Sequence, residues 1–220
     1  MLNSDIIEEL VKKYINDRQT VAFGTADLAE TFLKKLALRI EHENLQISVI
    51  PTSVKIAALM HEFALQSASI NDANPDVAFE FVEQVDEHYN YIKRSTNSLV
   101  RDKMIAQFAN VLVVIARKED FVKKLHGEIP FEVCPFGWKR TLLQLQTLGR
   151  AKLRKVKELP FKTESGNYLI DVEVDEIYSH EDLDYQGRKI PGVLETGLFI
   201  GYADRILLHN HAIEVKSRLA

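Results

Sequence analysis

Cysteine is almost absent from this chain of 220 residues, and its single copy, Cys134, excludes an internal disulfide framework. Cys134 lies in FEVCPF, with apolar residues on both sides, so we expect a buried structural thiol rather than a reactive nucleophile. No apolar run approaches the roughly 20 residues that a membrane span needs. MLNSDIIEELVKKYI carries charges where a secretory signal would be apolar. We therefore expect a cytoplasmic protein with neither a membrane span nor a secretory signal.

A strong charge of either sign is also missing. The chain has 28 Lys and Arg against 32 Asp and Glu, which gives a formal net charge of −4. Scattered basic residues on an acidic background do not form the basic surface that nucleic acid requires, so no nucleic-acid partner is expected. Hydrophobic residues make up 46% of the chain, which is typical of a globular protein with a sizeable core.

Apolar runs alternate with helical patterns through the first half of the chain. Residues 3–16 predict an amphipathic helix, with Asn3 or Ser4 available as its cap. Four continuously apolar runs follow, at 20–23, 47–50, 77–81 and 111–115, and helices are expected after Gly24, from about Ser53, from about Ser98 and, briefly, after Ile115. This alternation predicts an α/β fold: a parallel sheet covered by helices on both faces, with ligands at the carboxyl ends of its strands.

The pattern changes after Pro135. We expect a leucine-rich helix over 142–148, a strand-like LRKVKELPF, a turn at 165–167, a strand over 168–174 and a polar stretch to Lys189. These elements predict a small α+β unit beside the sheet. Residues 190–199 and 205–210 are expected to be strands that return to the first unit.

Six segments in order, covering nearly the whole chain, resemble motifs of the A-type ribose-5-phosphate isomerase family. They are TVAFGTADLAETFLKKL, similar to the phosphate loop G-T-G-S-T; VIPTS, similar to the second strand and its T-S turn; EFVEQVDEHYNYIKRSTNSLVRDK, similar to D-G-A-D-E-V-D followed by L-I-K-G-G-G-G-A-L-x-R-E-K; IPFEVCPFGW, similar to P-V-E-V-x-P-F; FKTESGNYLIDV, similar to T-D-N-G-N-x-I-x-D; and IPGVLETGLF, similar to I-P-G-V-x-E-T-G-L-F.

The resemblance implies a Rossmann-like domain over 1–128 and 193–220 and a small ferredoxin-like α+β domain over 129–192. It implies a homodimer or homotetramer that needs no metal or cofactor. The implied reaction is the interconversion of ribose 5-phosphate and ribulose 5-phosphate through an enediolate, a step of the pentose phosphate pathway. Carried over by position, the catalytic residues are Asp102 as the base, Lys93, Glu80 and Glu83, and the substrate-binding residues are Thr25, Thr52, Ser53 and, within a residue or two, Lys118.

Several of these positions depart from the family pattern. Asp102 is a methylene shorter than the family's glutamate, whereas Glu80 and Glu83 are longer than its aspartates. Family glycines, which adopt positive φ at no steric cost, are replaced by Arg94, Ser95, Thr96 and Asn97, and the small residues of D-G-A-D by Phe81 and Val82. Asp27 would place a carboxylate in the turn that binds the phosphate dianion.

Structural interpretations compete with the functional ones. Asp27 is expected to cap a helix, and Thr25, Thr52 and Ser53 are either turn and cap residues or phosphate contacts. Glu80 and Glu83 are either catalytic or solvated acids at a strand end. Arg94, Arg101 and Lys103 read as an exposed basic face rather than a phosphate site. His209 and His211 share one side of an expected strand but lack a third ligand, so we predict no metal site.

Three hypotheses remain open. The chain is an active isomerase with a rebuilt phosphate site, a catalytically impaired homologue that binds a metabolite or a protein, or an enzyme for an unphosphorylated sugar or acid.

Overall fold

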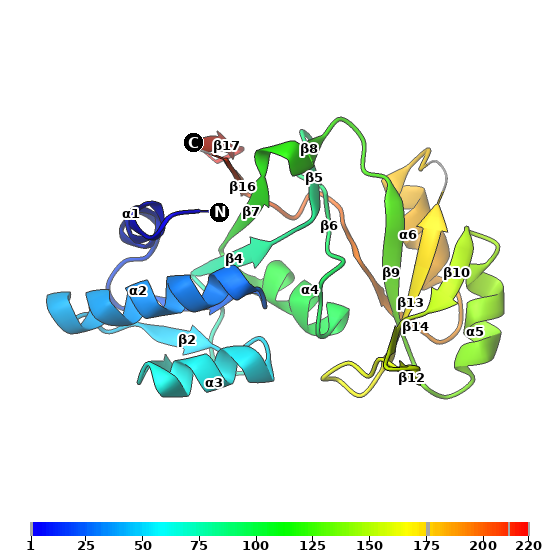
Figure 1. Cartoon of the computed structure of the whole chain (residues 1–220), viewed down its shortest axis with the longest axis horizontal. Helices are drawn as coiled ribbons and strands as arrows, with labels where there is room; N and C mark the ends of the chain where they lie inside the picture. Colours follow the sequence, from blue (N-terminus) through cyan, green and yellow to red (C-terminus); the bar gives the residue numbers. More distant parts are fainter. Residues whose placement is uncertain (1, 175–176, 211, 220) are drawn as a thin grey trace. The chain divides into compact units, whose positions relative to one another are not determined.

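The computed structural model describes residues 2–174, 177–210 and 212–219, which group into two compact units (Figure 1). The first unit comprises the described residues of Met1–Phe81, Met104–Lys118 and Ala203–Ala220, and the second comprises those of Val82–Lys103 and Glu119–Tyr202. Helix α4 (Leu99–Phe108) crosses the boundary, so that its first half belongs to the second unit. These units divide the chain at other residues than the predicted domains do, and the domain boundaries stay a prediction.

A seven-stranded sheet forms the centre of the first unit. Its order is β17-β16-β7-β4-β1-β2-β3, and every neighbouring pair is parallel except β16 with β17. The elements of this unit are β1 (Thr20–Phe23), β2 (Ser48–Ile50), β3 (Gln66–Ser67), β4 (Val77–Phe81), β7 (Val111–Arg117), β16 (Arg205–His209), β17 (Ile213–Ser217), α1 (Ser4–Tyr14), α2 (Asp27–Glu43) and α3 (Val54–Glu62). The predicted α/β fold is confirmed.

Both faces of this sheet are buried, as its continuously apolar strands require. Alternate strand residues, among them Val21, Phe23 and Phe79, join one core with the inner sides of α1, α2 and α3. Their neighbours in sequence, such as Ala22 and Ala78, are 0% exposed on the opposite face.

The strand order of the first unit reverses between β1 and β4. From β1 the sheet grows through β2 in one direction and through β4 and β7 in the other. In open parallel sheets such a reversal leaves a crevice at the carboxyl ends of the two strands, where ligands bind. The turn that begins at Gly24 and the end of β4 at Glu80 and Phe81 occupy this position.

The second unit contains an antiparallel sheet with the order β10-β13-β9-β14. Along the chain its elements are β9 (Gly127–Val133), α5 (Trp138–Leu145), β10 (Arg150–Leu153), β13 (Tyr168–Val174), α6 (His180–Arg188) and β14 (Val193–Thr196). This β-α-β-β-α-β succession in this strand order is the ferredoxin-like arrangement that the resemblance implies. Phe131, Ile170, Val172 and Leu145 form its core.

A second small sheet and a hairpin complete the second unit. The sheet has the order β15-β6-β5-β8, with β5 (Gln84–Asp86), β6 (Tyr91–Ile92), β8 (Phe121–Val122) and β15 (Leu198–Phe199). β11 (Lys155–Val156) and β12 (Leu159–Pro160) pair as the hairpin. Tyr91 stacks on Phe199 with ring centroids 4.4 Å apart, which ties β6 to β15.

Five local predictions are corrected. Residues 190–199 do not return to the first sheet, because β14 pairs with β9 and β15 with β6. The polar stretch before Lys189 contains α6, which Ser179 caps by accepting from the Asp182 N–H at 3.0 Å. The helix predicted over 142–148 starts earlier, at Trp138, and the short helix after Ile115 is only the 3-10 turn Lys118–Asp120. Cys134 is half-buried rather than buried.

Candidate active site

Two turns of the first unit meet through their hydroxyl groups. The Thr25 hydroxyl, after β1, donates to Ser53 Oγ, after β2, at 2.6 Å, and the Thr52 hydroxyl donates to the Phe23 carbonyl at 2.6 Å. Ser53 also caps α3, since its Oγ accepts from the Ile56 N–H at 3.2 Å. The N-termini of α2 and α3 therefore lie beside these hydroxyls, in a setting that favours an anion.

Asp27 takes a different place from the one predicted for it. Ala26 is the N-cap of α2 and Asp27 is the first helical residue, so the expected side-chain cap is wrong. The Asp27 carboxylate is fully exposed and pairs with Lys55 Nζ, in the first turn of α3, at 2.7 Å. Its hydrogen bond with Lys55 lowers the pKa of Asp27. The negative charge in this turn is thus matched by a cation from the neighbouring helix.

The Glu80 carboxylate lies directly over Gly24. Glu80 is buried at 0% exposure on β4, so the prediction of a solvated acid is wrong. A Cβ atom at residue 24 would lie 2.5 Å from Glu80 Oε2, a separation that only glycine avoids. Phe81, the next residue, packs its ring against Phe32 with centroids 5.8 Å apart. The extra length of Glu80 is therefore accommodated by the missing side chain at Gly24.

Lys118 lies after β7 and pairs with Glu214 of β17 at 2.9 Å. Both side chains are more than two-fifths exposed, at 57% and 42%. The structure places Lys118 at the β17 side of the sheet and does not group it with Thr25, Thr52 and Ser53. Its substrate-binding role stays a prediction.

Asp102 is a buried carboxyl on the first turn of α4. Asp102 is 4% exposed, and its Oδ2 accepts a hydrogen bond from the Thr96 hydroxyl at 2.5 Å. Burial raises the pKa of Asp102, and the negative charges of Glu132 and Glu164 raise it further. The positive charge of Lys93 and the hydrogen bond from Thr96 act in the opposite direction. A carboxyl with a raised pKa has the character of a general base.

Lys93 is a fully buried lysine at the end of β6. Its backbone N–H donates to the Gly197 carbonyl at 3.0 Å. A Cβ at residue 197 would lie 2.9 Å from the Lys93 carbonyl oxygen, so this approach requires glycine. The close approach of the Lys93 and Gly197 backbones therefore fixes where the Lys93 side chain starts.

Glu83 holds the loop that follows Lys93. Its two carboxylate oxygens accept from the backbone N–H groups of Arg94, at 2.8 Å, and Ser95, at 2.9 Å. None of the four loop residues Arg94, Ser95, Thr96 and Asn97 has positive φ. The backbone of this loop therefore adopts no conformation that requires the glycines of the family motif. The half-buried Glu83 acts on the backbone rather than as a solvated acid.

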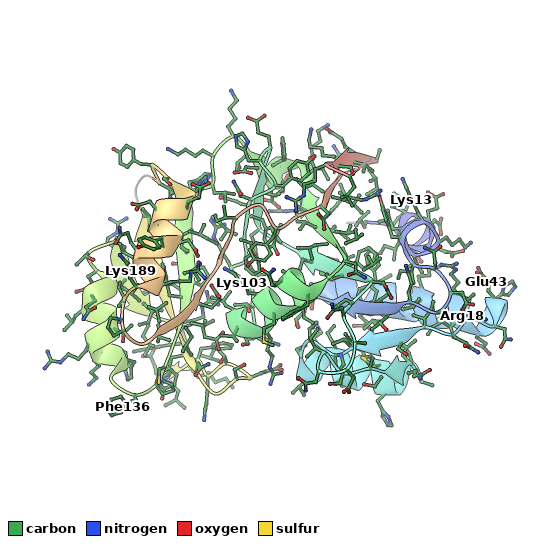
Figure 2. All side chains as sticks on the ribbon, turned by 180° about the vertical axis from the view of Figure 1, so that it is seen from behind. Lys13, Arg18, Glu43, Lys103, Phe136 and Lys189 are labelled. Atoms are coloured by element: carbon green, nitrogen blue, oxygen red, sulfur yellow. The ribbon has the colours of Figure 1, made fainter. Side chains whose placement is uncertain are left out.

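The basic residues around α4 do not form an exposed face, which corrects the prediction. Arg94 donates to the carbonyls of Glu128 and His126, and Arg101 pairs with Glu164 at 2.9 Å. Lys103, labelled on α4 in Figure 2, is 8% exposed and donates to the Leu198 carbonyl at 2.6 Å. It also pairs with Glu195 at 3.0 Å, and burial lowers its pKa. Arg94, Arg101 and Lys103 thus all pair with groups of the second unit.

The described residues contain neither a metal-binding cluster nor a membrane-spanning helix. No group of three or more His, Cys, Asp or Glu side chains there is placed to hold a metal ion. His211 lies outside the described residues, so the predicted absence of a metal site stays a prediction. No helix in the described ranges has the length and apolar character that crossing a membrane requires.

Comparison with known proteins identifies the family. The model of the family "Ribose 5-phosphate isomerase A (phosphoriboisomerase A)" matches residues 48–212. The chain is 35% identical over 199 residues to ribose-5-phosphate isomerase A 2 of Oceanobacillus iheyensis, with 89% of each chain covered. It is 30% identical over 204 residues to ribose-5-phosphate isomerase A of Ruegeria pomeroyi, which covers 88% of this chain and 78% of that protein.

This chain belongs to the ribose 5-phosphate isomerase A family. Solved structures of such enzymes share its fold. Ribose 5-phosphate isomerase A from Methanocaldococcus jannaschii superposes with a TM-score of 0.90 at 27% identity, over 98% of this chain and 97% of that one. A D-ribose-5-phosphate isomerase solved in complex with phospho-erythronic acid gives the same TM-score and identity. The predicted family and the predicted fold are confirmed.

Within the isomerase family pattern, the structure brings some predicted residues together and adds others. Glu83 and Lys93 lie on connected loops of the second unit and Asp102 on the first turn of α4, and Thr25, Thr52 and Ser53 lie on adjacent turns of the first unit. Sequence analysis assigned no site role to Thr96, Ser98 or Glu132, the last a carboxylate at 0% exposure. Glu132 stands in the family-like segment IPFEVCPF, where an acid between apolar residues of a strand was a signal that could have singled it out.

Proposed function

We propose that this chain is a working ribose 5-phosphate isomerase, with a site rebuilt by substitution rather than degenerate. The observation that carries the proposal is the buried Asp102, which Thr96 holds and Lys93 influences electrostatically. A non-catalytic homologue would have no need to bury a carboxyl, a lysine and a threonine hydroxyl together, because burial of each polar group costs free energy.

In the proposed reaction Asp102 takes the proton from C2 of open-chain ribose 5-phosphate. The electron pair of the C–H bond forms the C1–C2 double bond of an enediolate, and the carbonyl oxygen on C1 takes up negative charge. The Lys93 ammonium stabilises that oxygen. Return of the proton to C1, and transfer of the C2 hydroxyl proton to the oxygen on C1, yields ribulose 5-phosphate.

We assign the phosphate to the turns after β1 and β2. Two helix N-termini and the Ser53 hydroxyl, which accepts from Thr25, offer it donors, and Lys55 offsets the charge of Asp27. Support comes from the related isomerase that was solved with phospho-erythronic acid, itself a phosphorylated sugar acid. Binding of that compound to this protein should be abolished by placing a second acid here, as in Thr25→Asp.

The resemblance also implies a homodimer or homotetramer in the cytoplasm, acting in the pentose phosphate pathway. Light scattering on the purified protein measures its oligomeric state directly. A monomer in solution at micromolar concentration would contradict it.

The test of the proposed function is turnover of ribose 5-phosphate by the purified protein, beside Asp102→Asn and Lys93→Ala. We expect wild-type turnover and a fall of at least about a hundredfold in Asp102→Asn, since general-base catalysis contributes about 10²–10⁴-fold. An exposed acid of the second unit, Glu158, is 94% exposed and supplies the matched control Glu158→Gln, which should keep wild-type turnover. A folded wild type that turns nothing over would leave a binding protein, or an enzyme for an unphosphorylated substrate.

A further inference from the structure

Thr96 is the hydroxyl that contacts the proposed base. Its Oγ lies 2.5 Å from Asp102 Oδ2, and the two residues are 7% and 4% exposed. An ionised carboxylate only accepts hydrogen bonds, so the proton in this contact comes from the threonine. The family pattern has a glycine at this position, which offers no such hydroxyl.

A second contact fixes the direction of that hydroxyl. The Ser98 backbone N–H donates to Thr96 Oγ1 at 3.0 Å. A hydroxyl carries one proton and accepts through its lone pairs. Because Thr96 accepts from Ser98, its own proton is directed to Asp102.

Ser98 is in turn held by the buried Glu132. The Ser98 hydroxyl lies 3.1 Å from Glu132 Oε2, which also accepts from the Val100 N–H at 3.0 Å in the first turn of α4. Glu132 Oε1 accepts from Thr163 and Asn167 at 2.8 and 2.9 Å. The loop that carries Thr96 is therefore anchored to β9 and to the start of the helix that carries Asp102.

We propose that Thr96 is a positioning residue for the general base: it holds Oδ2 of the shortened Asp102 and leaves Oδ1 to take the substrate proton. The inference rests on the proposed function. An aspartate places its carboxylate about an ångström further back than a glutamate, a displacement that can cost about a hundredfold in rate if the carboxylate is free to move. A fixed carboxylate limits that loss.

Four groups act on Asp102 besides its burial. They are the Lys93 ammonium from the end of β6, the Thr96 hydroxyl, the Glu132 carboxylate from β9 and the Glu164 carboxylate from the loop before β13. Loss of the Thr96 hydroxyl removes one of the two influences that lower the pKa of Asp102. The base would then require a higher pH to ionise.

The decisive comparison is between Thr96→Val, which keeps the shape and removes the hydroxyl, and Thr96→Ser, which keeps the hydroxyl. We expect Thr96→Val to lower kcat by about tenfold to a hundredfold and to move the acid limb of the kcat/KM profile to higher pH. Thr96→Ser should stay near wild type in both. Thr141→Val is the matched control, since Thr141 is a 4% exposed threonine whose hydroxyl donates to the Pro191 carbonyl, at 3.0 Å. It should alter stability alone.

Two results would overturn the inference: an unmoved acid limb with wild-type kcat in Thr96→Val, or equal losses in Thr96→Val and Thr96→Ser. If Thr96→Val does not fold, kcat and the acid limb of kcat/KM are measured on Thr96→Ala instead, with the same expected changes. Failure of the proposed function shows differently, as a wild type without turnover. Turnover that depends on Asp102 but not on Thr96 would reject the positioning role alone.

Discussion

At the scale of single residues, three carboxylates of the candidate site each have a contact that suits the length of the side chain. Asp102, the proposed base, is a methylene shorter than the glutamate of the family motif, and the Thr96 hydroxyl donates to its carboxylate. Glu80 has gained a methylene and fits because residue 24 has no side chain. Glu83 uses its length to accept from two backbone N–H groups. Each change in length is thus met by a contact in its own unit.

The Gly24 and Glu80 contact yields a prediction at the residue scale. Gly24→Ala should lower the free energy of unfolding by about 1–3 kcal/mol, as overpacking does, because the new methyl group meets the Glu80 carboxylate. Adding Glu80→Asp should recover most of this loss, since the shorter acid withdraws. Urea unfolding of both single variants and the double variant measures the coupling. Additive losses would show that the two positions do not touch.

Residue identity in the site was only partly predictable from sequence. Resemblance to the family motifs nominated Lys93, Asp102 and Glu83 as site residues. It did not reveal the hydrogen bond from Thr96 or the pairing of Asp27 with Lys55, because such contacts depend on how separate loops approach. From the sequence alone, Asp27 is expected to repel a phosphate, because its partner Lys55 lies 28 residues further along the chain.

At the scale of elements, α4 joins the proposed base to a buried carboxylate. The helix begins at Leu99, and Glu132 from β9 accepts the N–H of Val100 at 3.0 Å, where the positive end of the helix dipole favours a negative charge. Ser98, Thr163 and Asn167 donate to the same carboxylate. The position of Asp102 therefore depends on β9 as well as on its own helix.

Glu132→Gln should shift the pH profile in the direction opposite to Thr96→Val. The negative charge of Glu132 raises the pKa of Asp102, so its removal lowers that pKa and moves the acid limb of kcat/KM to lower pH. The amide N–H₂ would also face groups that donate, at a cost of about 1–3 kcal/mol in stability. A pH profile beside thermal unfolding measures both effects.

Glu128→Gln is the control for this variant. Glu128 lies on the same strand but pairs with Lys152 and is 33% exposed. It should leave the acid limb in place. A limb that stays in place in Glu132→Gln as well would contradict the electrostatic link to Asp102.

The elements themselves were predictable where hydrophobic pattern dominates. The apolar runs 77–81 and 20–23 are β4 and β1 at those same residues, because strands buried on both faces leave little room for polar positions. Helix α6 was missed since HEDLDYQGR has few apolar residues and is fixed by a serine cap and by Gly187 against Phe131. The pairing of β14 with β9 is a long-range choice that the local sequence of 190–199 does not encode.

The whole molecule combines a parallel-sheet unit and a ferredoxin-like unit, each with its own core. The hydroxyls and helix N-termini proposed for the phosphate belong to the first unit. A phosphorylated sugar should therefore bind more tightly than the same sugar without phosphate.

Ligand-dependent melting checks this preference. Ribose 5-phosphate at about a hundred times its Kd should stabilise the folded protein by about 2.7 kcal/mol and raise its melting temperature accordingly. Free ribose at the same concentration should give a much smaller shift, because it lacks the dianion that the helix N-termini favour. An equal or larger shift with ribose would point to an unphosphorylated substrate.

The central claim is that Asp102 moves a proton between C1 and C2 of ribose 5-phosphate. Its most direct test is to equilibrate ribose 5-phosphate with the wild-type protein in D₂O and follow the C1 and C2 protons by NMR. The account predicts that ribulose 5-phosphate forms and that solvent deuterium enters C2 of ribose 5-phosphate and one of the two C1 positions of ribulose 5-phosphate, with neither change in Asp102→Asn. Absence of ribulose 5-phosphate from the wild-type sample, or full retention of protium at C2 of ribose 5-phosphate after equilibration, would contradict it.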